Sequence, residues 1–528
     1  INYMILRKII LIFSILALTA TSCSSDGNTE GSTYNRTADE ASTTTEAPAE
    51  TTDPAEDESS EEGRDELIAL LTIGFGLETE EFATCMVDEM HAVSGYTYAL
   101  LLESTLSEEE ESDLDEIATE VAISCISNLS LEEIEKLSAT NFGEDDGNLF
   151  EDESTVPTLE ISSDPDALGA ILSVEEIDFA DETIVGWLVT YRSRSVSGEP
   201  IEVTGTIVAP NSVATEPRPV FSVAHGTTGM ADMCAPSLAY TGEDVELNAL
   251  VQPLLDDGWV VAATDFEGMG GPGLHPYIVG ASEAQGVFDI VRAAQTAPTL
   301  GADGPLIVWG HSQGGHAAMH ASQLWQDIAP ELNLVGVGAG APPSQFPLLK
   351  DFLMDGAFQG YLVMVAAAFA EVYDELSLET IVEPEYLPLV EELELGCTGH
   401  IFDIFNPIPF ADLTSVDDIF ANPEWNARLI QNDTNQVPNQ TPVVILHGDQ
   451  DEQIPAISSQ ILLDQICALE GHEHIERVLY EGHTHGSAPG AYWTDLLAWM
   501  DARVSAEPVN QEKGCSTVTV PNSDDQTD

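Results

Sequence analysis

A glycine-flanked serine follows a short apolar run in the second half of the chain. Residues 306–309 are Leu, Ile, Val and Trp, and Gly310 and Gly314 flank Ser312 in the pattern G-x-S-x-G. The run predicts a strand buried on both faces, and the glycines suit a sharp strand-to-helix turn that exposes a serine. A serine hydroxyl is a weak nucleophile until a base removes its proton. The pattern alone also fits an ordinary glycine-rich turn, so the interpretation depends on an acid and a base elsewhere.

In catalytic sites whose serine lies in a G-x-S-x-G turn, the acid lies between the serine and the base along the chain. Residues 443–455, VVILHGDQDEQIP, are an apolar run followed by a loop with two aspartates. Asp451 has the spacing G-x-x-D-x-x-[VI]-P, which is usual for the acid loop of hydrolases whose serine lies in a G-x-S-x-G turn. Asp449 suits a turn residue that bonds its own backbone. We therefore predict that Asp451 is the acid.

The base is expected in the loop after the last apolar run, VLYEGHTHGSAP at 478–489. Tyr480 and His485 fit Y-x-G-x-x-H, a spacing common before a catalytic histidine, so His485 is preferred to His483. A histidine pair could instead bind a metal, but no cysteine or carboxylate cluster accompanies it. We predict no metal and no cofactor, and a triad of Ser312 as nucleophile, Asp451 as acid and His485 as base.

The tetrahedral intermediate of this chemistry needs preorganised N–H donors for its oxyanion. Gln313, directly after the serine, is predicted to supply one. Two places are open for the second donor. One is the loop HGTTG at 225–229, with Gly226 and Thr227, and the other is Asp265, which ends the next apolar run.

Apolar runs and helical patterns alternate over most of the second half of the chain. Runs at 183–196 and 201–210 predict an opening antiparallel pair of strands. Shorter runs, each ending in a polar or glycine-rich loop, predict further strands at 218–226, 258–268, 305–312, 332–342, 441–451 and 475–485. Helical segments such as 282–295 lie between several of them. This alternation predicts an α/β, doubly wound, mostly parallel sheet with functional loops at the carboxyl ends of its strands.

Length and charge set the broad class of the protein. The chain has 528 residues, more than one compact domain of ordinary size. Lys and Arg total 14 against 93 Asp and Glu, for a net charge of −79. This charge excludes nucleic acid and an anionic membrane surface as partners.

The first residues predict export. Basic residues precede the apolar run 9–20, and small residues follow it, which is typical of a secretory signal. The stretch ATSC at 20–23 resembles a bacterial lipobox, which implies that Cys23 is lipidated. We predict a lipoprotein signal peptide over 1–23 and a protein attached to a membrane through Cys23. It would lie at the bacterial cell surface or be released outside the cell.

Two further segments precede the predicted sheet. Residues 24–63 are mostly Ser, Thr, Asp, Glu, Ala and Pro, which predicts a disordered acidic linker. Over 64–142, apolar side chains at four-residue spacing predict a small acidic helical domain. Two of its helical stretches carry one cysteine each, so Cys85–Cys125 is the simplest disulfide in this exported chain.

From about residue 160 to 515 the chain resembles the secretory lipase family. The matching stretches are MCAPS at 233–237, VVAATDFEG at 260–268, GHSQGG at 310–315, APELNLVGVGAGAPP at 329–343, NDTN at 432–435 and HGDQDEQIP at 447–455. Residues 275–295, HPYIVGASEAQGVFDIVRAAQ, also resemble bacterial members.

The resemblance implies an α/β-hydrolase fold over 156–515 and the same triad, and it favours Asp265 beside Gln313 at the oxyanion hole. It implies that an apolar insertion at about 345–430 is a lid or cap over an acyl pocket. It also implies two disulfides, Cys234–Cys397 and Cys467–Cys515. Residues 516–528 are predicted to be a disordered tail.

The predicted function is a serine ester hydrolase, a triacylglycerol lipase or esterase, that forms an acyl-enzyme on Ser312 and cleaves esters with hydrophobic acyl chains. One alternative is an esterase on short-chain, aromatic or polyester substrates, which would use the same triad. A second alternative is a non-catalytic, lipid-anchored surface binding protein, against which the complete triad argues. The acyl-chain preference and the oligomeric state stay open.

Overall fold

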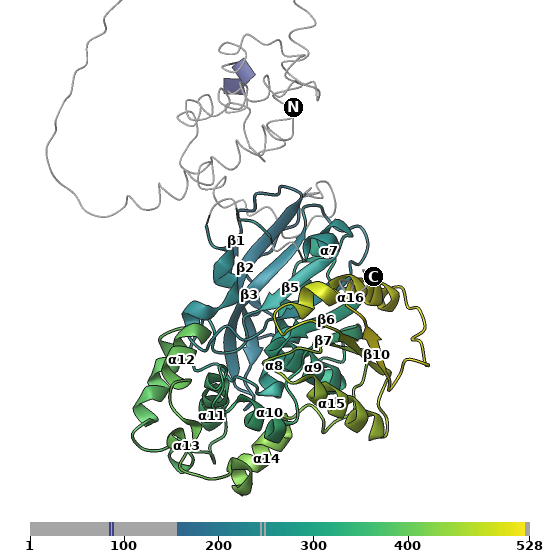
Figure 1. The fold of residues 1–528 in the computed structure, drawn as a ribbon. Helices are drawn as coiled ribbons and strands as arrows, with labels where there is room; N and C mark the ends of the chain where they lie inside the picture. Colours follow the sequence, from purple (N-terminus) through teal and green to yellow (C-terminus); the bar gives the residue numbers. More distant parts are fainter. Residues whose placement is uncertain (1–83, 86, 89–155, 243–244, 248–249, 523–528) are drawn as a thin grey trace, which may run out of the picture. The chain divides into compact units, whose positions relative to one another are not determined.

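The computed structural model describes residues 84–85, 87–88, 156–242, 245–247 and 250–522 (Figure 1). By its internal contacts the chain divides into two units, Ile1–Glu151 and Asp152–Asp528. In the first unit, Thr84, Cys85, Val87 and Asp88 are helical. The predicted signal peptide, linker, Cys23 and Cys125 lie outside the described residues, and the predicted Cys85–Cys125 pair does so in part.

One sheet organises the second unit, in the strand order β1-β2-β3-β5-β4-β6-β7-β8-β9-β10. Strands β1 to β3 and β5 pair antiparallel, and every pair from β5 through β4 to β10 is parallel. The strands are β1 (Ile171–Glu176), β2 (Ile184–Arg194), β3 (Pro200–Pro210), β4 (Val220–Ala224), β5 (Val260–Thr264), β6 (Leu306–His311), β7 (Leu334–Gly340), β8 (Val443–Gly448), β9 (Ile475–Tyr480) and β10 (Thr517–Val520). The predicted mostly parallel sheet is confirmed.

Helices cover both faces of the sheet. Neighbouring residues of a strand point to opposite faces, so adjacent side chains of one strand pack against different helices. On one face, Val220 of β4 packs in a core with α8 (Gly280–Gln295), α9 (Gln313–Ile328) and α15 (Ala456–Ala468). On the other, Phe221 packs with α7 (Gln252–Asp256) and α16 (Ala488–Val504). The remaining short helices outside the insertion are η2 (Asp232–Cys234), η3 (Pro236–Tyr240) and η4 (Pro298–Leu300).

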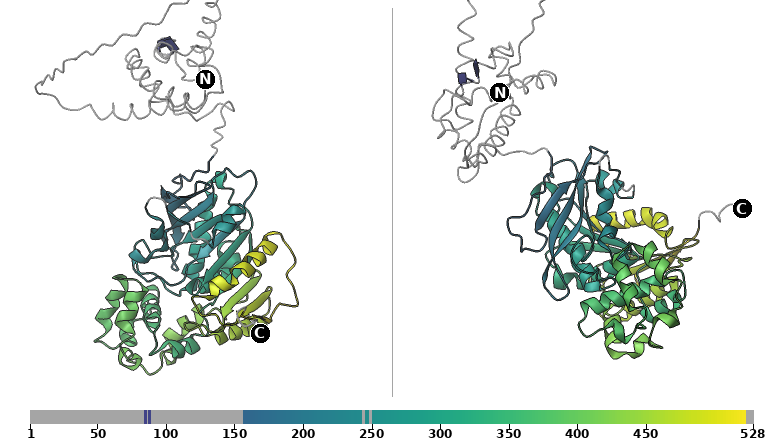
Figure 2. Two further views of the ribbon diagram at one scale, coloured as in Figure 1. Left: turned by 45° about the horizontal axis from the view of Figure 1, so that its top comes forward. Right: turned by 90° about the vertical axis from the view of Figure 1, so that its left-hand side faces the viewer.

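The insertion between β7 and β8 is helical and has its own apolar cluster. Its elements are α10 (Phe346–Leu353), α11 (Gly360–Val372), η5 (Leu378–Thr380), η6 (Leu387–Glu394), α12 (Thr398–Phe405), α13 (Phe410–Leu413), η7 (Ile419–Ala421) and α14 (Pro423–Asn432). Figures 1 and 2 show these helices gathered at one end of the sheet. In the described part of the chain, no helix is long and apolar enough to cross a membrane.

Both disulfides implied by the family resemblance are present in the structure. Cys234 bonds Cys397 across 163 residues, and Cys467 bonds Cys515 across 48 residues. Closing loops of this length stabilises a folded chain by about 4 to 5 kcal/mol in the chain-entropy model. Cys467 and Cys515 also form a group of possible metal ligands with His472, but their sulfurs are used by the disulfide.

The prediction of a disordered tail from residue 516 is wrong for its first part. Thr517–Val520 form β10, which pairs in parallel with Arg477–Tyr480 of β9. Two features explain this strand. Its residues alternate threonine with valine, which suits a strand. The disulfide to Cys467 also holds Cys515, two residues before β10, beside the sheet.

Candidate active site

Ser312 is the single residue between β6 and α9. Its backbone has φ 61° and ψ −122°, and its N–H donates to the carbonyl of Gly340 at 2.9 Å. A non-glycine residue rarely adopts this backbone conformation, which costs about 1–3 kcal/mol. A Cβ on Gly314 would lie 1.9 Å from the carbonyl oxygen of Ala224, and one on Gly310 would lie 2.3 Å from that of Gly314. The G-x-S-x-G pattern therefore reflects the close backbone packing of this turn.

An apolar cavity opens at Ser312 and extends among the helices of the insertion. Ser312 is 8% exposed, and it lines this cavity with apolar side chains that include Ile278, Leu362, Leu413 and Ile454. Lys350 and Asp417 are the charged residues among the lining side chains in the described part of the chain. The nucleophile predicted from the sequence thus faces an apolar space that the insertion helps to form.

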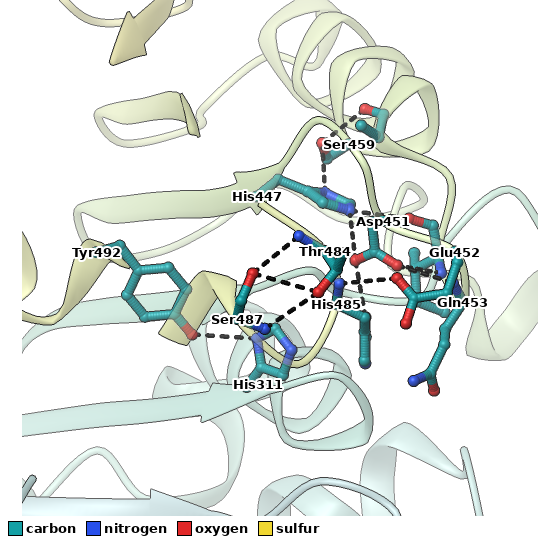
Figure 3. A network of polar contacts seen from close by, with 12 residues as sticks. His311, His447, Asp451, Glu452, Gln453, Ser459, Thr484, His485, Ser487 and Tyr492 are labelled. Carbon is teal, nitrogen blue, oxygen red and sulfur yellow. Dashed lines mark hydrogen bonds and ion pairs between the residues drawn. The ribbon is translucent and has the colours of Figure 1, made fainter. Parts of the chain in front are cut away.

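Asp451 and His485 lie side by side, from the loops after β8 and β9 (Figure 3). His485 Nδ1 donates to Asp451 Oδ2 at 2.7 Å, and Asp451 Oδ1 accepts the N–H groups of Gln453 and Ile454 at 2.9 and 2.8 Å. Burial raises the pKa of Asp451, but contacts with His447 and His485 outweigh burial and hold that pKa well below its usual range. An ionised Asp451 that accepts from Nδ1 leaves Nε2 of His485 free to act as a base.

His485 also lies against the residue that precedes the serine. The ring centroids of His485 and His311 are 4.5 Å apart, and His311 Nδ1 is 3.1 Å from the hydroxyl of Tyr492 (Figure 3). Burial lowers the pKa of His311 to about 3, so this ring is neutral. No hydrogen bond in the described part of the chain joins Ser312 Oγ to His485. Such hydrogen bonds are often long in enzymes without substrate and shorten when substrate binds.

Asp449 and His483, the residues judged less suitable as the acid and the base, make other contacts. Asp449 Oδ1 accepts the N–H of Gly482 at 2.7 Å, so it joins the two loops instead of orienting a histidine. His483 Nδ1 is 3.3 Å from Ser487 Oγ. Among the described residues, neither Asp449 nor His483 forms a hydrogen bond or ion pair with Asp451 or His485 through its side chain. The structure brings together the acid and the base that the spacing predicts.

Two residues that support the triad were not predicted from the sequence. His447 Nε2 lies 3.2 Å from Asp451 Oδ2, and its Nδ1 lies 2.8 Å from Ser459 Oγ. Glu452 Oε2 accepts the backbone N–H of His485 at 3.1 Å. His447 lies in the strand before the predicted acid loop and Glu452 lies within that loop. Nothing in a single sequence indicates that their side chains turn toward Asp451 and His485.

The structure favours Gly226 and Thr227 over Asp265 as the second source of an oxyanion donor. The backbone N–H of Asp265 donates to the carbonyl of Thr204 at 2.9 Å, and its carboxylate accepts from Ser237 and Thr204 at 2.9 and 2.7 Å. The expectation for Asp265 is thus at odds with the structure, because strand β3 already uses its N–H.

The loop with Gly226 lies directly against the serine. A Cβ on Gly226 would lie 3.7 Å from Ser312 Cβ. Among the described residues, no hydrogen bond uses the backbone N–H of Gly226, Thr227 or Gln313. Gln313 is the first residue of α9, where such a free N–H is expected. The Cys234–Cys397 disulfide and a hydrogen bond of 3.0 Å from Thr398 to Thr228 tie this loop to the insertion.

Comparisons with known proteins show the family and the fold of this chain. A family model described as Secretory lipase matches residues 239–512, slightly more than half of the chain. Lipase A of Arthroderma benhamiae is 24% identical over 356 residues, which cover 63% of this chain and 73% of that protein. A protein of Mycobacterium tuberculosis named "Probable inactive lipase" is 24% identical over 364 residues, 65% of this chain and 80% of that protein. The solved structure of Candida antarctica lipase A is similar with a TM-score of 0.59 and 20% identity, over 67% of this chain and 86% of that chain.

Proposed function

The chain belongs to the secretory lipase family and has the predicted α/β-hydrolase fold, and we propose that it hydrolyses carboxylic esters with hydrophobic acyl chains through an acyl-enzyme on Ser312. The observation that carries the proposal is the 2.7 Å hydrogen bond between His485 and Asp451 beside a serine in a left-handed turn. Membership in the family supports ester hydrolysis. The serine mechanism and the substrate class are our proposals.

The first half of the reaction forms the acyl-enzyme. Ser312 Oγ attacks the ester carbonyl carbon while His485 Nε2 takes the hydroxyl proton, and Asp451 stabilises the imidazolium that results. The carbonyl oxygen becomes an oxyanion, for which we propose the N–H of Gln313 and an N–H of Gly226 or Thr227 as donors. When the intermediate collapses, the C–O bond to the alcohol breaks, and His485 protonates the departing alcohol.

The second half returns the enzyme to its starting state. His485 takes a proton from water, whose oxygen attacks the acyl carbon, and the carbon–oxygen bond to Ser312 breaks. The proton passes from His485 to Ser312 Oγ, and the carboxylic acid leaves. Atoms and charges balance over the cycle without a cofactor.

The apolar cavity supports a hydrophobic acyl group as substrate. Its lining comes largely from the insertion, which we propose is the lid or cap over the acyl pocket. The alternative of a short-chain, aromatic or polyester esterase keeps the same triad and differs only in what the cavity admits. The alternative of a binding protein gains some support from the relative named inactive, but this chain pairs an acid with a histidine beside the elbow, which binding alone does not need.

We expect chain-length preference to separate these functions. Against p-nitrophenyl esters of two to sixteen carbons, kcat/KM is expected to rise at least about 10-fold from acetate to octanoate, because each buried methylene contributes up to about 0.8 kcal/mol. A maximum at acetate without octanoate hydrolysis would indicate the short-chain esterase. No hydrolysis of any ester would indicate the binding protein.

A variant of the cavity provides a control for this measurement. Ala366 of α11 lines the cavity, whereas Ala370, one turn further along the same helix, does not. Ala366→Trp should lower kcat/KM for octanoate more than for acetate. Ala370→Trp should leave the ratio of the two unchanged.

Family membership also bears on where the protein acts. A match to secretory lipases supports export. We propose in addition that Cys23 carries lipid and attaches the protein to the membrane at the bacterial cell surface, with an ester or lipid as its substrate partner.

A further inference from the structure

Two stretches that match the family, 275–295 and 432–435, take no part in the proposed reaction. In the structure both reach the buried side of the turn that holds Ser312. Glu283, on α8, is fully buried, and Asn432, the last residue of α14, is 2% exposed. Polar side chains at such depth are costly unless they are hydrogen-bonded, so their contacts indicate what they do.

The carboxylate of Glu283 joins three residues around the serine. Glu283 Oε1 accepts the backbone N–H of Ile278 and Nε2 of Gln313, both at 3.2 Å. Glu283 Oε2 lies 2.6 Å from Nδ1 of His316. Ile278 lines the cavity, Gln313 is a proposed oxyanion donor, and His316 lies in the first turn of α9. A single carboxylate thus contacts the backbone of a cavity-wall residue, the side chain of a proposed oxyanion donor and the helix that follows the nucleophile.

A buried positive charge balances this carboxylate. Nδ1 of His316 faces Glu283, and its Nε2 faces the carbonyl oxygen of Asn432 at 2.7 Å, so both ring nitrogens donate. Burial lowers the pKa of His316, but the charge and hydrogen bond of Glu283 outweigh it and raise the pKa above its usual value. Both side chains are completely buried. Because desolvation often cancels the gain from such a pair, stability alone explains it poorly.

Gln313 has a second fixed partner. Its Nε2 lies 2.7 Å from Nε2 of His275, while Nδ1 of His275 donates to the carbonyl of Glu267 at 2.8 Å. Burial lowers the pKa of His275 to about 3, so the ring is neutral and its Nε2 accepts from Gln313. Both hydrogens of the Gln313 amide nitrogen are therefore held, one by His275 and one by Glu283.

Ile278 is held in an unusual backbone conformation. Its φ is 60°, which is rare for a β-branched residue and costs about 1–3 kcal/mol. The hydrogen bond from its N–H to Glu283 opposes relaxation of this segment, whose side chain forms part of the wall beside Ser312.

We propose that Glu283 is a positioning residue for ester hydrolysis: its carboxylate, balanced by His316, fixes Gln313 at the oxyanion hole and Ile278 in the cavity wall. This inference rests on the proposed function of the site. Glu283 itself does not touch the reacting atoms.

The test compares kcat per active site, titrated with a fluorophosphonate, in variants of two buried carboxylates on α8. Glu283→Ala is expected to lower kcat about 10- to 100-fold with KM unchanged within about threefold, because displaced donors weaken mainly the transition state. Glu283→Gln keeps an oxygen that can accept from Ile278 and Gln313, so it should stay within about fivefold of the parent.

Asp289 provides the matched control on the same helix. It is also fully buried and contacts Arg292 at 2.5 Å and Ser193 at 2.6 Å. Asp289→Asn should lower the melting temperature while leaving kcat per titrated site unchanged. The proposal is overturned if Glu283→Ala keeps the parental kcat per titrated site, or if Asp289→Asn loses as much.

A crystal structure of Glu283→Ala gives a readout that does not depend on ester hydrolysis. We expect Ile278 to leave the left-handed region and the Gln313 side chain to move away from its present position. If both keep their positions, Glu283 does not position them, and the inference fails even if the parent hydrolyses esters. If the parent hydrolyses no ester but these segments move, only the proposed function fails. Should Glu283→Ala not fold, Glu283→Asp, which withdraws the carboxylate by one methylene, replaces it in both measurements.

Discussion

Replacing Ser312 with alanine is expected to abolish ester hydrolysis while leaving the fold intact. The substitution removes the only atom proposed to form the acyl-enzyme, and kcat should fall by about five to six orders of magnitude, as for other nucleophilic serines. Alanine keeps the Cβ of serine, so the left-handed turn at φ 61° gains no new strain. Initial rates on p-nitrophenyl esters measure the loss, and the melting temperature checks the fold.

A serine on α9, the helix that follows Ser312, serves as the control for this variant. Ser322 is fully buried, and its Oγ donates to the carbonyl of Met319 at 2.7 Å. Ser322→Ala should keep nearly all of the activity. Substantial hydrolysis by Ser312→Ala would mean that another group is the nucleophile.

Removing the base or the acid is expected to lower kcat by about 10⁴-fold, the scale of a lost triad member. His485→Ala removes the group that takes the serine proton. Asp451→Asn removes the charge that holds Nδ1 of His485 protonated across the 2.7 Å hydrogen bond. Steady-state kinetics on the preferred ester measure both effects.

The adjacent residues of the same types are the matched controls. His483→Ala and Asp449→Asn should cost far less, because His483 contacts Ser487 and Asp449 accepts from Gly482, away from the acid–base pair. A larger loss of kcat in His483→Ala than in His485→Ala would show that the wrong histidine has been assigned as the base.

The central strands of the fold could be predicted because their residues are apolar and bounded by turn residues. The two strands at the edges of the sheet, β1 and β10, could not be predicted. Ile171–Glu176, ILSVEE, carries polar residues at half of its positions because β1 lies at the edge of the sheet. Thr517–Val520 follows a mostly polar segment at 505–516, and its pairing with β9 depends on contacts across about forty residues of chain. The order β3-β5-β4-β6 is likewise a tertiary property.

The site divides in the same way. Ser312, Asp451 and His485 were indicated by the spacing of residues within three short loops. Each of these loops follows the carboxyl end of a buried strand. Asp265 failed as a predicted donor because a partner strand, through Thr204, occupies its N–H. Glu283 could not be predicted because its partners lie on two segments, one just before α8 and one in the first turn of α9. A single sequence does not show which buried polar residues meet.

The most direct test of the account is covalent labelling of the full chain with a fluorophosphonate, followed by mass spectrometry of its peptides. The expected result is one modification per chain, on Ser312, in the parent protein, and a much slower reaction in His485→Ala because the serine has lost its base. Two results would contradict the assignment of Ser312 as the nucleophile. One is labelling of a different residue. The other is that the fluorophosphonate leaves Ser312 unmodified in a protein that hydrolyses esters.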